Sequence, residues 1–193
     1  MLQTALHFSH TLLKEIIQVG DVVVDATMGN GNDTAFLAEL VGSTGLVYAF
    51  DIQEQALINT EKKITELGLN NQTILLQQGH ETVGKTIPEE TELTAAIFNL
   101  GYLPKSDKQI ITKPDTTKKA LDALVARLKR KGRIILVVYY GHAGGEAELA
   151  LVQKYSQQLA QEEYSVLTYQ FINQKNNPPI LFCIEKNRTH TTN

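Results

Sequence analysis

A glycine-rich loop between carboxylates is the feature of the sequence best suited to chemistry. The stretch VVVDATMGNGNDT, residues 22–34, runs from β-branched residues into Asp25 and then into a Gly29-Asn30-Gly31 turn. Asn32-Asp33-Thr34 then favours a helix N-terminus, because short polar side chains satisfy the free amides there. A strand, a Gly-x-Gly turn and a helix in this order are typical of a nucleotide-binding site.

Two differences from phosphate-binding loops indicate which nucleotide-like ligand this loop binds. Thr34 stands where the dinucleotide pattern Gly-x-Gly-x-x-Gly has its third glycine, and the Gly-Lys-Ser/Thr of a P-loop is absent. Asp33 would also repel a phosphate at the helix N-terminus. S-adenosylmethionine carries an ammonium, a carboxylate and a sulfonium but no phosphate, which suits Asp25 and the glycine amides. The loop therefore predicts an S-adenosylmethionine site and disfavours an NAD-type oxidoreductase.

Two further strand ends extend the candidate cofactor site. Asp51 ends the second strand, where a carboxylate can accept both ribose hydroxyls, and Gln53 lies within reach to help. The third strand ends at QQGHE, which we expect to border the adenine ring. The candidate cofactor residues are Asp25, Thr27, Gly29, Asn30, Gly31, Asn32, Asp33, Thr34, Asp51, Gln53, Gly79, His80 and Glu81.

Alternating elements must position these residues. Strands are predicted over 21–27, 45–51, 72–78, 93–100, 133–140, 165–172 and 179–186, and helices over 2–19, 33–42, 53–69, 116–132 and 144–162, with a short helix after the third strand. Continuous apolar strands that alternate with helices predict an α/β fold whose mostly parallel sheet is buried on both faces. The last two strands lack a helix between them, so they pair antiparallel or sit apart. We expect a single domain over 1–193, with an amphipathic helix within 1–20 and a frayed tail at 187–193.

Composition and charge limit the classes of ligand and partner that we expect for this chain. The 193 residues are 42% apolar, and the single cysteine, Cys183, excludes a disulfide framework or a Cys-rich zinc site, so no metal is expected. No signal peptide and no run of about 18 apolar residues is present, which predicts a cytoplasmic protein without a membrane span. The net charge of −3 conceals a segment, 105–133, that carries +7. This segment could bind a polyanion, although Lys129–Arg133 could instead complement a helix C-terminus.

The loop and the acids together resemble those of class I S-adenosylmethionine-dependent methyltransferases, in which Asp-x-x-x-Gly-x-Gly is followed by an acidic residue such as Asp51. The fourth strand ends in NLGYLP, which resembles the Asn-Pro-Pro-Tyr motif of amino-group methyltransferases. The resemblance implies that the Asn99 side-chain oxygen and the Leu100 carbonyl accept the hydrogens of a target amine. Tyr102 would then pack beside the nucleoside.

DATMGNGNDT, NLGYLP, YYGHAGGEAE and NNPPILFCIEK resemble, more narrowly, a small bacterial family long called putative rRNA methylase and now associated with tRNA wobble-uridine modification. The resemblance implies a Rossmann-like, doubly wound, seven-stranded sheet with an antiparallel C-terminal hairpin, and a homodimer. It also implies methylation of the exocyclic amine of 5-aminomethyl-2-thiouridine at the tRNA wobble position, giving the 5-methylaminomethyl product.

Direct transfer of a methyl group to a neutral amine needs neither a metal nor a covalent enzyme intermediate. Lys105, Lys108 and Lys113 follow the motif and are predicted to contact RNA phosphates. Tyr140 and His142, together with Tyr139, are the nearest candidates to surround the amine, without an assigned role. The alternatives are an rRNA base methyltransferase, a small-molecule or protein amine methyltransferase, and a non-catalytic S-adenosylmethionine-binding module.

Overall fold

The computed structural model describes residues 1–101 and 112–187, and within them seven strands form one sheet. The strands are β1 (Val22–Asp25), β2 (Leu46–Phe50), β3 (Thr73–Leu76), β4 (Leu93–Leu100), β5 (Leu128–Val138), β6 (Tyr164–Tyr169) and β7 (Ile180–Lys186). Their order across the sheet is β3-β2-β1-β4-β5-β7-β6. Strands β1 to β5 run parallel, whereas β7 is antiparallel to both β5 and β6. The predicted parallel sheet and antiparallel closing hairpin are both confirmed.

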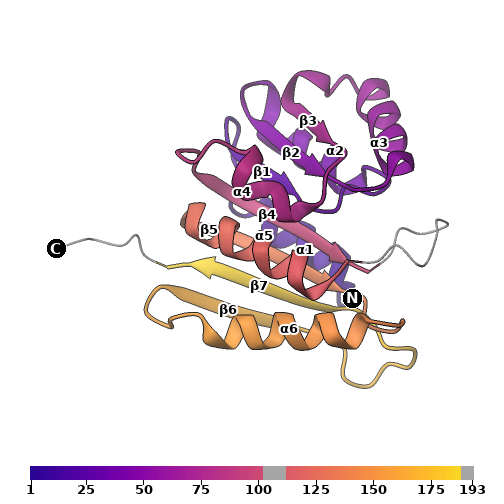
Figure 1. The fold of residues 1–193 in the computed structure, drawn as a ribbon, viewed down its shortest axis with the longest axis vertical. Coiled ribbons are helices and arrows are strands. Elements are labelled where there is room, and N and C mark those ends of the chain that lie inside the picture. The colour runs from indigo at the N-terminus through magenta and orange to yellow at the C-terminus, as the bar shows by residue number, and fades with distance from the viewer. Residues whose placement is uncertain (102–111, 188–193) are drawn as a thin grey trace.

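Six α-helices cover the two faces of this sheet in the described part of the chain (Figure 1). They are α1 (Ala5–Lys14), α2 (Asn32–Val41), α3 (Glu54–Glu66), α4 (Val83–Thr86), α5 (Pro114–Arg127) and α6 (Gly145–Gln158). Apolar side chains of α1, α2 and α3 pack on one face, and those of α4, α5 and α6 pack on the other. Because both faces are covered, the central strands are buried along nearly their whole length: seven of the eight residues of β4 are buried.

The strand order reverses between β1 and β4. β2 and β3 lie on one side of β1, while β4 and β5 lie on the other. The loops that leave β1 and β4 therefore diverge, one toward each face of the sheet, and open a crevice at the carboxyl ends of these strands. Loop 26–31 and Gly101, the residue after β4, meet at this crevice.

Two predicted helices differ most in their bounds from the structure. The N-terminal helix spans Ala5–Lys14 rather than 2–19, and Thr4 caps it by accepting a hydrogen bond from the His7 amide at 3.3 Å. The helix predicted over 116–132 ends at Arg127, because the next residue, Leu128, is already buried and paired with Leu93 in the sheet.

The basic cluster Lys129–Arg133 consequently lies on β5. The interpretation that these cations complement a helix C-terminus is therefore wrong. The cluster contains an irregularity in pairing with β4, where Lys131 adopts a left-handed backbone with φ of 62°. Lys129 pairs with Asp21 at 2.7 Å, and Arg133 pairs with Glu15 and Glu185. These cations sit at the amino-terminal end of a parallel strand, opposite the crevice.

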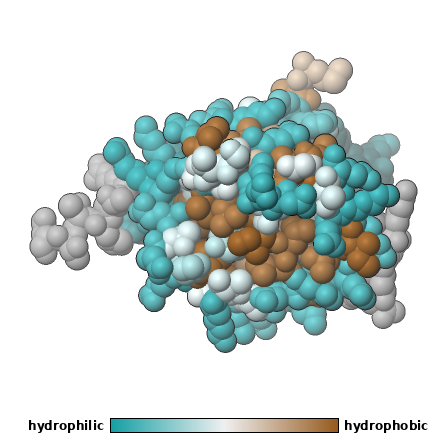
Figure 2. Space-filling model, turned by 90° about the horizontal axis from the view of Figure 1, so that it is seen from above, coloured by the Kyte–Doolittle hydropathy of each residue, from teal (hydrophilic) through white to brown (hydrophobic). Residues whose placement is uncertain are grey.

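The β3 end of the sheet exposes apolar side chains. Figure 2 shows apolar residues at the surface among polar ones in the view onto this end of the molecule. The exposed large apolar residues of the chain between β2 and β3 and of β3 itself are Ile52, Ile58, Leu67 and Ile74. No helix within the described ranges is both long enough and apolar enough to cross a membrane.

Candidate active site

A cavity of about 890 Å³ opens at the carboxyl ends of β1, β2 and β4, where the strand order reverses. Such a volume is in the range of small-molecule sites. Its walls come from α1, the loops after β1, β2, β3 and β4, the start of α5, the residues after β5 and the loop before β7. The cavity therefore collects residues from across the sequence at one edge of the sheet.

Most of the predicted site residues line this cavity. From the cofactor set these are Thr27, Gly29, Asn30, Asn32, Asp33, Asp51, Gln53, Gly79, His80 and Glu81, and from the substrate set Asn99, Lys113 and His142. Tyr139, to which no role was assigned, also lines it. Asp25, Gly31, Thr34, Leu100 and Tyr140 are not part of the wall. Tyr102, Lys105 and Lys108 lie outside the described residues.

The glycine turn is held in one conformation by its neighbours. Gly31 has a φ of 73°, in the left-handed region that favours glycine, and a Cβ at this position would lie 2.9 Å from Thr60 Oγ1 of α3. The Gly31 amide donates to the Met28 carbonyl at 2.7 Å, and Thr60 Oγ1 donates to the Gly29 carbonyl at 3.1 Å. Gly31 is therefore excluded from the cavity wall because it packs against α3, yet it sets the shape of the wall.

Asp25 lies beneath the turn and not in the cavity. Its carboxylate is fully buried and accepts hydrogen bonds from Thr34 Oγ1 at 2.6 Å and from the Thr27 amide at 3.2 Å. Burial, together with the nearby negative charge of Asp33, raises the pKa of Asp25 to about 7. Asp25 and Thr34 thus tie the end of β1 to the first turn of α2 from outside the cavity wall.

One end of the cavity is built around Asp51. Its carboxylate accepts the amides of Gly29 at 3.1 Å and Gln53 at 3.0 Å, which fixes the oxygens while the residue still borders the cavity. Burial raises the pKa of Asp51, and these amide bonds oppose that effect.

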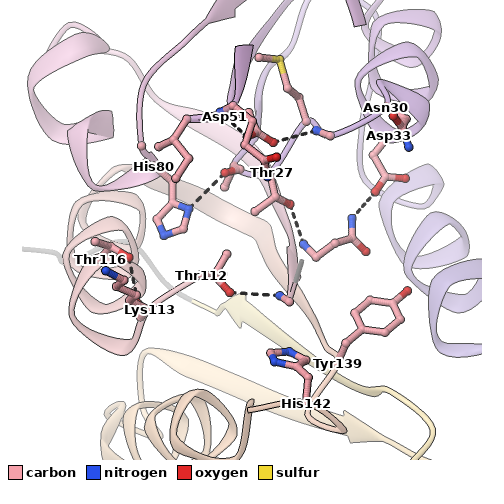
Figure 3. Close-up of a pocket in the computed structure, with 18 of the residues that line it drawn as sticks. Thr27, Asn30, Asp33, Asp51, His80, Thr112, Lys113, Thr116, Tyr139 and His142 are labelled. Carbon is pink, nitrogen blue, oxygen red and sulfur yellow. Dashed lines mark hydrogen bonds between the residues drawn. The ribbon is translucent and has the colours of Figure 1, made fainter. Parts of the chain in front are cut away.

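His80 stands beside this end of the cavity (Figure 3). Its Nδ1 lies 3.3 Å from the Ala26 carbonyl, and because a carbonyl only accepts, Nδ1 carries the proton and Nε2 is an acceptor. Burial lowers the pKa of His80 and so favours this neutral form. Nε2 is buried without a hydrogen-bond partner among the described residues.

The opposite part of the cavity is built around Asn99, the last polar side chain of β4. The Asn99 backbone amide donates to Thr27 Oγ1 at 2.8 Å, and its side-chain Nδ2 donates to Asp33 Oδ2 at 2.5 Å. Its side-chain oxygen, Oδ1, is buried and has no hydrogen-bond partner among the described residues. Tyr139 and His142 approach from the end of β5 (Figure 3), and burial with the nearby Asp33 raises the pKa of the Tyr139 phenol.

The charges of the wall favour a cationic ligand over a phosphate. Asp33, Asp51 and Glu81 supply three carboxylates, against the single lysine of the described wall, Lys113. A sulfonium is attracted by this surplus, whereas a pyrophosphate would be repelled. The residues present therefore fit S-adenosylmethionine: Asp51 could hold the ribose hydroxyls, Gly29 and Asn30 would face the ligand, and Gly79 to Glu81 would border the adenine.

Several wall residues carry no strong signal in the sequence. They are Leu6, Ala26, Met28, Ile52, Gly101, Thr112, Thr116, Gly141, Asn176 and Asn177. Some of them directly adjoin predicted motifs and could have been found by extending those motifs. Leu6 of α1 and the Asn176-Asn177 pair of the β6–β7 loop reach the cavity only through the tertiary fold.

Comparison with known proteins now identifies the family. Residues 47–185 match the family model described as "Putative rRNA methylase". This chain belongs to that family. It is 37% identical over 190 residues, 94% of this chain and 69% of the relative, to a chloroplastic tRNA (mnm(5)s(2)U34)-methyltransferase of Arabidopsis thaliana.

Solved structures of this family share the whole fold. The structure of a "putative rRNA-methylase" from Clostridium thermocellum superposes with a TM-score of 0.93 at 45% identity, covering 96% of this chain and 99% of that one. The structure of a "putative methyltransferase" from Streptococcus mutans in complex with SAH superposes with a TM-score of 0.88 at 42% identity, covering 96% and 99%. The predicted Rossmann-like methyltransferase fold, the methyltransferase activity and S-adenosylmethionine as cofactor are confirmed.

Proposed function

We propose that this methyltransferase acts on the primary amine of 5-aminomethyl-2-thiouridine at the wobble position of tRNA and produces the 5-methylaminomethyl nucleoside. The observation that carries the proposal is the buried Asn99 Oδ1, an acceptor without a partner among the described residues, on the wall of a cavity that suits the cofactor. A primary amine supplies the hydrogens that this oxygen lacks. The Arabidopsis relative, named for this tRNA reaction, supports the choice of substrate.

Asn99 would orient the amine for attack. Its Oδ1 would accept one N–H, so that the nitrogen lone pair is directed toward the methyl group, and orientation of this kind removes much of a reaction barrier. Thr27 fixes the backbone of Asn99 and Asp33 fixes its amide nitrogen. The Leu100 carbonyl, predicted as a second acceptor, accepts the Tyr139 amide at 2.9 Å, and Leu100 is not part of the cavity wall, so we assign the acceptor role to Asn99 alone.

The amine must be neutral to act as a nucleophile. S-adenosylmethionine, when bound, supplies an activated methyl group on a positively charged sulfur. A second positive charge on the amine would be disfavoured beside that sulfur, and partial burial in the cavity disfavours it further. Tyr139 and His142, which line the cavity next to Gly101, would enclose the amine and limit access of water.

Lys113 would contact the RNA backbone near the cavity mouth. Lys113 lies at the N-terminal end of α5 and borders the cavity. This position suits a contact with an RNA phosphate that stays away from the carboxylates of the cavity wall. Lys113→Ala should weaken tRNA binding and reduce its salt dependence. Lys131→Asn, at the opposite end of the sheet in a left-handed backbone that Asn tolerates, is the matched control. Equal tRNA affinity and salt dependence in both variants would contradict the phosphate contact.

A turnover assay with three substrate classes tests the proposal. Purified protein with radiolabelled S-adenosylmethionine should methylate tRNA that carries 5-aminomethyl-2-thiouridine, and mass spectrometry of nucleosides should identify the 5-methylaminomethyl product. Methylation of ribosomal RNA instead would favour the activity in the family description, and methylation of small amines or proteins alone would favour that alternative.

Asn99→Ala separates catalysis from mere cofactor binding. We expect a loss of roughly 100-fold in turnover with cofactor affinity retained, since one positioned hydrogen-bonding group is typically worth this much. Asn71→Ala, an exposed asparagine after α3, is the control. Unchanged function in Asn99→Ala would indicate a non-catalytic binding module or a different acceptor. The predicted homodimer and cytoplasmic location stay predictions.

A further inference from the structure

A chain of hydrogen bonds joins the N-terminal helix to Asn99. His10 Nε2 of α1 lies 2.6 Å from Asp33 Oδ1, and Asn99 Nδ2 lies 2.5 Å from Asp33 Oδ2. The three residues come from α1, α2 and the end of β4, which lie far apart in the sequence. Asp33 is nearly fully buried, so it depends on these partners in place of water.

Asp33 determines which atom of the Asn99 side chain is left to accept a further hydrogen bond. An asparagine amide has an oxygen and a nitrogen of nearly equal size, and hydrogen bonding alone decides between the two orientations. A carboxylate only accepts, so it selects the nitrogen and leaves Oδ1 on the other side, where no partner is present among the described residues. The orientation that an amine substrate needs is therefore fixed by Asp33.

His10 in turn fixes the carboxylate. Because a carboxylate only accepts, Nε2 carries a hydrogen and donates a hydrogen bond to Asp33. The imidazole ring stacks on Phe36 of α2, with centroids 3.9 Å apart and planes 8° from parallel, so its direction is restricted. The helix that carries it is attached to the sheet by Arg133, which donates to the Leu12 carbonyl at 2.7 Å and to Glu15 at 2.6 Å.

We propose that His10 is a positioning residue for methyl transfer, acting through Asp33 to hold the Asn99 oxygen toward the target amine. Helix α1, which lies outside the alternating strands and helices, is then part of the active site and not only a cover for the sheet. This inference rests on the proposed function in one respect, which is that Asn99 accepts a substrate N–H. His10 itself is not part of the cavity wall.

Two substitutions of His10 separate hydrogen bonding from packing. His10→Phe keeps a ring that can stack on Phe36 but removes the donor to Asp33, whereas His10→Gln loses the ring and places an N–H donor near the position of Nε2. His7→Ala, an exposed histidine on the same helix, is the control.

We expect kcat on tRNA to fall about tenfold in His10→Phe, the effect of one lost hydrogen bond to a charged group. KM for S-adenosylmethionine should stay near that of the wild type. His10→Gln should recover kcat to within about threefold of the wild type. A kcat for His10→Phe within twofold of the wild type, or equal losses in both variants, would overturn the proposal, because a packing role predicts no rescue by glutamine.

A second measurement does not depend on turnover. In protein labelled with ¹⁵N-asparagine, the side-chain amide signal of Asn99 is identified by its absence in Asn99→Asp. We expect this signal to shift in His10→Phe and to stay close to the wild-type position in His10→Gln and His7→Ala. An unshifted signal in His10→Phe would overturn the inference. A wild-type protein that fails to methylate tRNA, with the expected shifts present, would overturn the proposed substrate but leave the positioning chain in place.

Discussion

Replacement of Asp25 by asparagine should make the protein more stable at neutral pH. Asp25 is a fully buried carboxylate whose two oxygens accept from Thr34 Oγ1 and the Thr27 amide. Asparagine can preserve this arrangement: its oxygen accepts the Thr27 amide and its nitrogen donates to the Thr34 hydroxyl, which can turn to accept. The substitution removes a buried negative charge while the local shape is kept.

The magnitude follows from the pKa of Asp25. Burial raises this pKa from its ordinary value of 3.8 to about 7. Because the folded protein holds the proton more tightly than the unfolded chain, the stabilising contribution is fully present below pH 4 and is lost as the pH rises toward 7. The difference between the two pKa values corresponds to a loss of up to about 4 kcal/mol in the free energy of unfolding. An asparagine side chain cannot ionise, so Asp25→Asn should lack this decline.

Urea unfolding between pH 4 and pH 8, without added cofactor, measures this effect. We expect the wild type and Asp25→Asn to be similarly stable near pH 4, with a gap in favour of the variant that opens between pH 4 and pH 7. Asp115→Asn, which removes an exposed carboxylate in the first turn of α5, should leave the pH dependence of the wild type intact. A parallel pH dependence in the wild type and Asp25→Asn, or a variant that is less stable at pH 7.5, would refute the reasoning.

Three further predictions concern the turn, the cofactor and the cysteine. Gly31→Ala should lower the free energy of unfolding by more than Gly68→Ala in denaturant titrations: both sites are left-handed and cost about 1–2 kcal/mol, but only a Cβ at Gly31 meets Thr60. Equal losses would show that the contact is relieved at no cost. Asp51→Ala should weaken S-adenosylmethionine binding at least about 100-fold by calorimetry, as expected for two lost hydrogen bonds to a charged acceptor, and a change below threefold would exclude Asp51 from the ribose site. The pKa of the Cys183 thiol is raised to about 12 by burial, so a thiol reagent at pH 8 should label it only after unfolding, and rapid labelling of the folded protein would contradict its buried position.

The fold was predictable because its signals are local and repeated. Each buried strand, such as Leu93–Leu100, is a mainly apolar run, and each is followed by a helix until the last two. A pattern of this kind has few solutions besides a parallel sheet covered on both faces. The closing hairpin followed from the lack of a connecting helix before Ile180–Lys186, since a parallel crossover needs one.

The sequence favours a helix over 116–132, because apolar residues recur at helical spacing up to the basic cluster Lys129–Arg133 and cations stabilise a helix C-terminus. In the structure, Leu128 leaves the helix to pair with Leu93, and the strand then passes an irregularity before regular pairing resumes at Arg133. A Cβ at Gly132 would lie 2.8 Å from two backbone oxygens, so this glycine permits the irregularity. The apolar periodicity of a sequence shows which residues are buried but not which element buries them. The boundary between α5 and β5 could therefore not be predicted from it.

The part of the cavity proposed to hold the cofactor was predictable in outline, because the residues that form it follow three strand ends in order. The acceptor half depends on contacts that no local pattern records. Asn176 and Asn177 reach the cavity with left-handed φ values of 67° and 49°, and His10 approaches from a helix that precedes the first strand. Neither feature has a spacing relation to the Gly-x-Gly turn, so only the fold could bring them there.

Asp33 illustrates how one side chain can carry both kinds of information. In the sequence, a carboxylate at the start of a helix disfavours a phosphate ligand at that helix N-terminus, and only the neighbouring residues are needed to predict this effect. In the structure, the same carboxylate joins His10 to Asn99 and so determines which atom a substrate would meet. A neutral residue at this position would therefore lose two effects at once, the repulsion of phosphates and the orientation of the acceptor. Asp33→Asn should for this reason reduce turnover at least as strongly as His10→Phe, and a milder loss would show that Asn99 is oriented by other contacts.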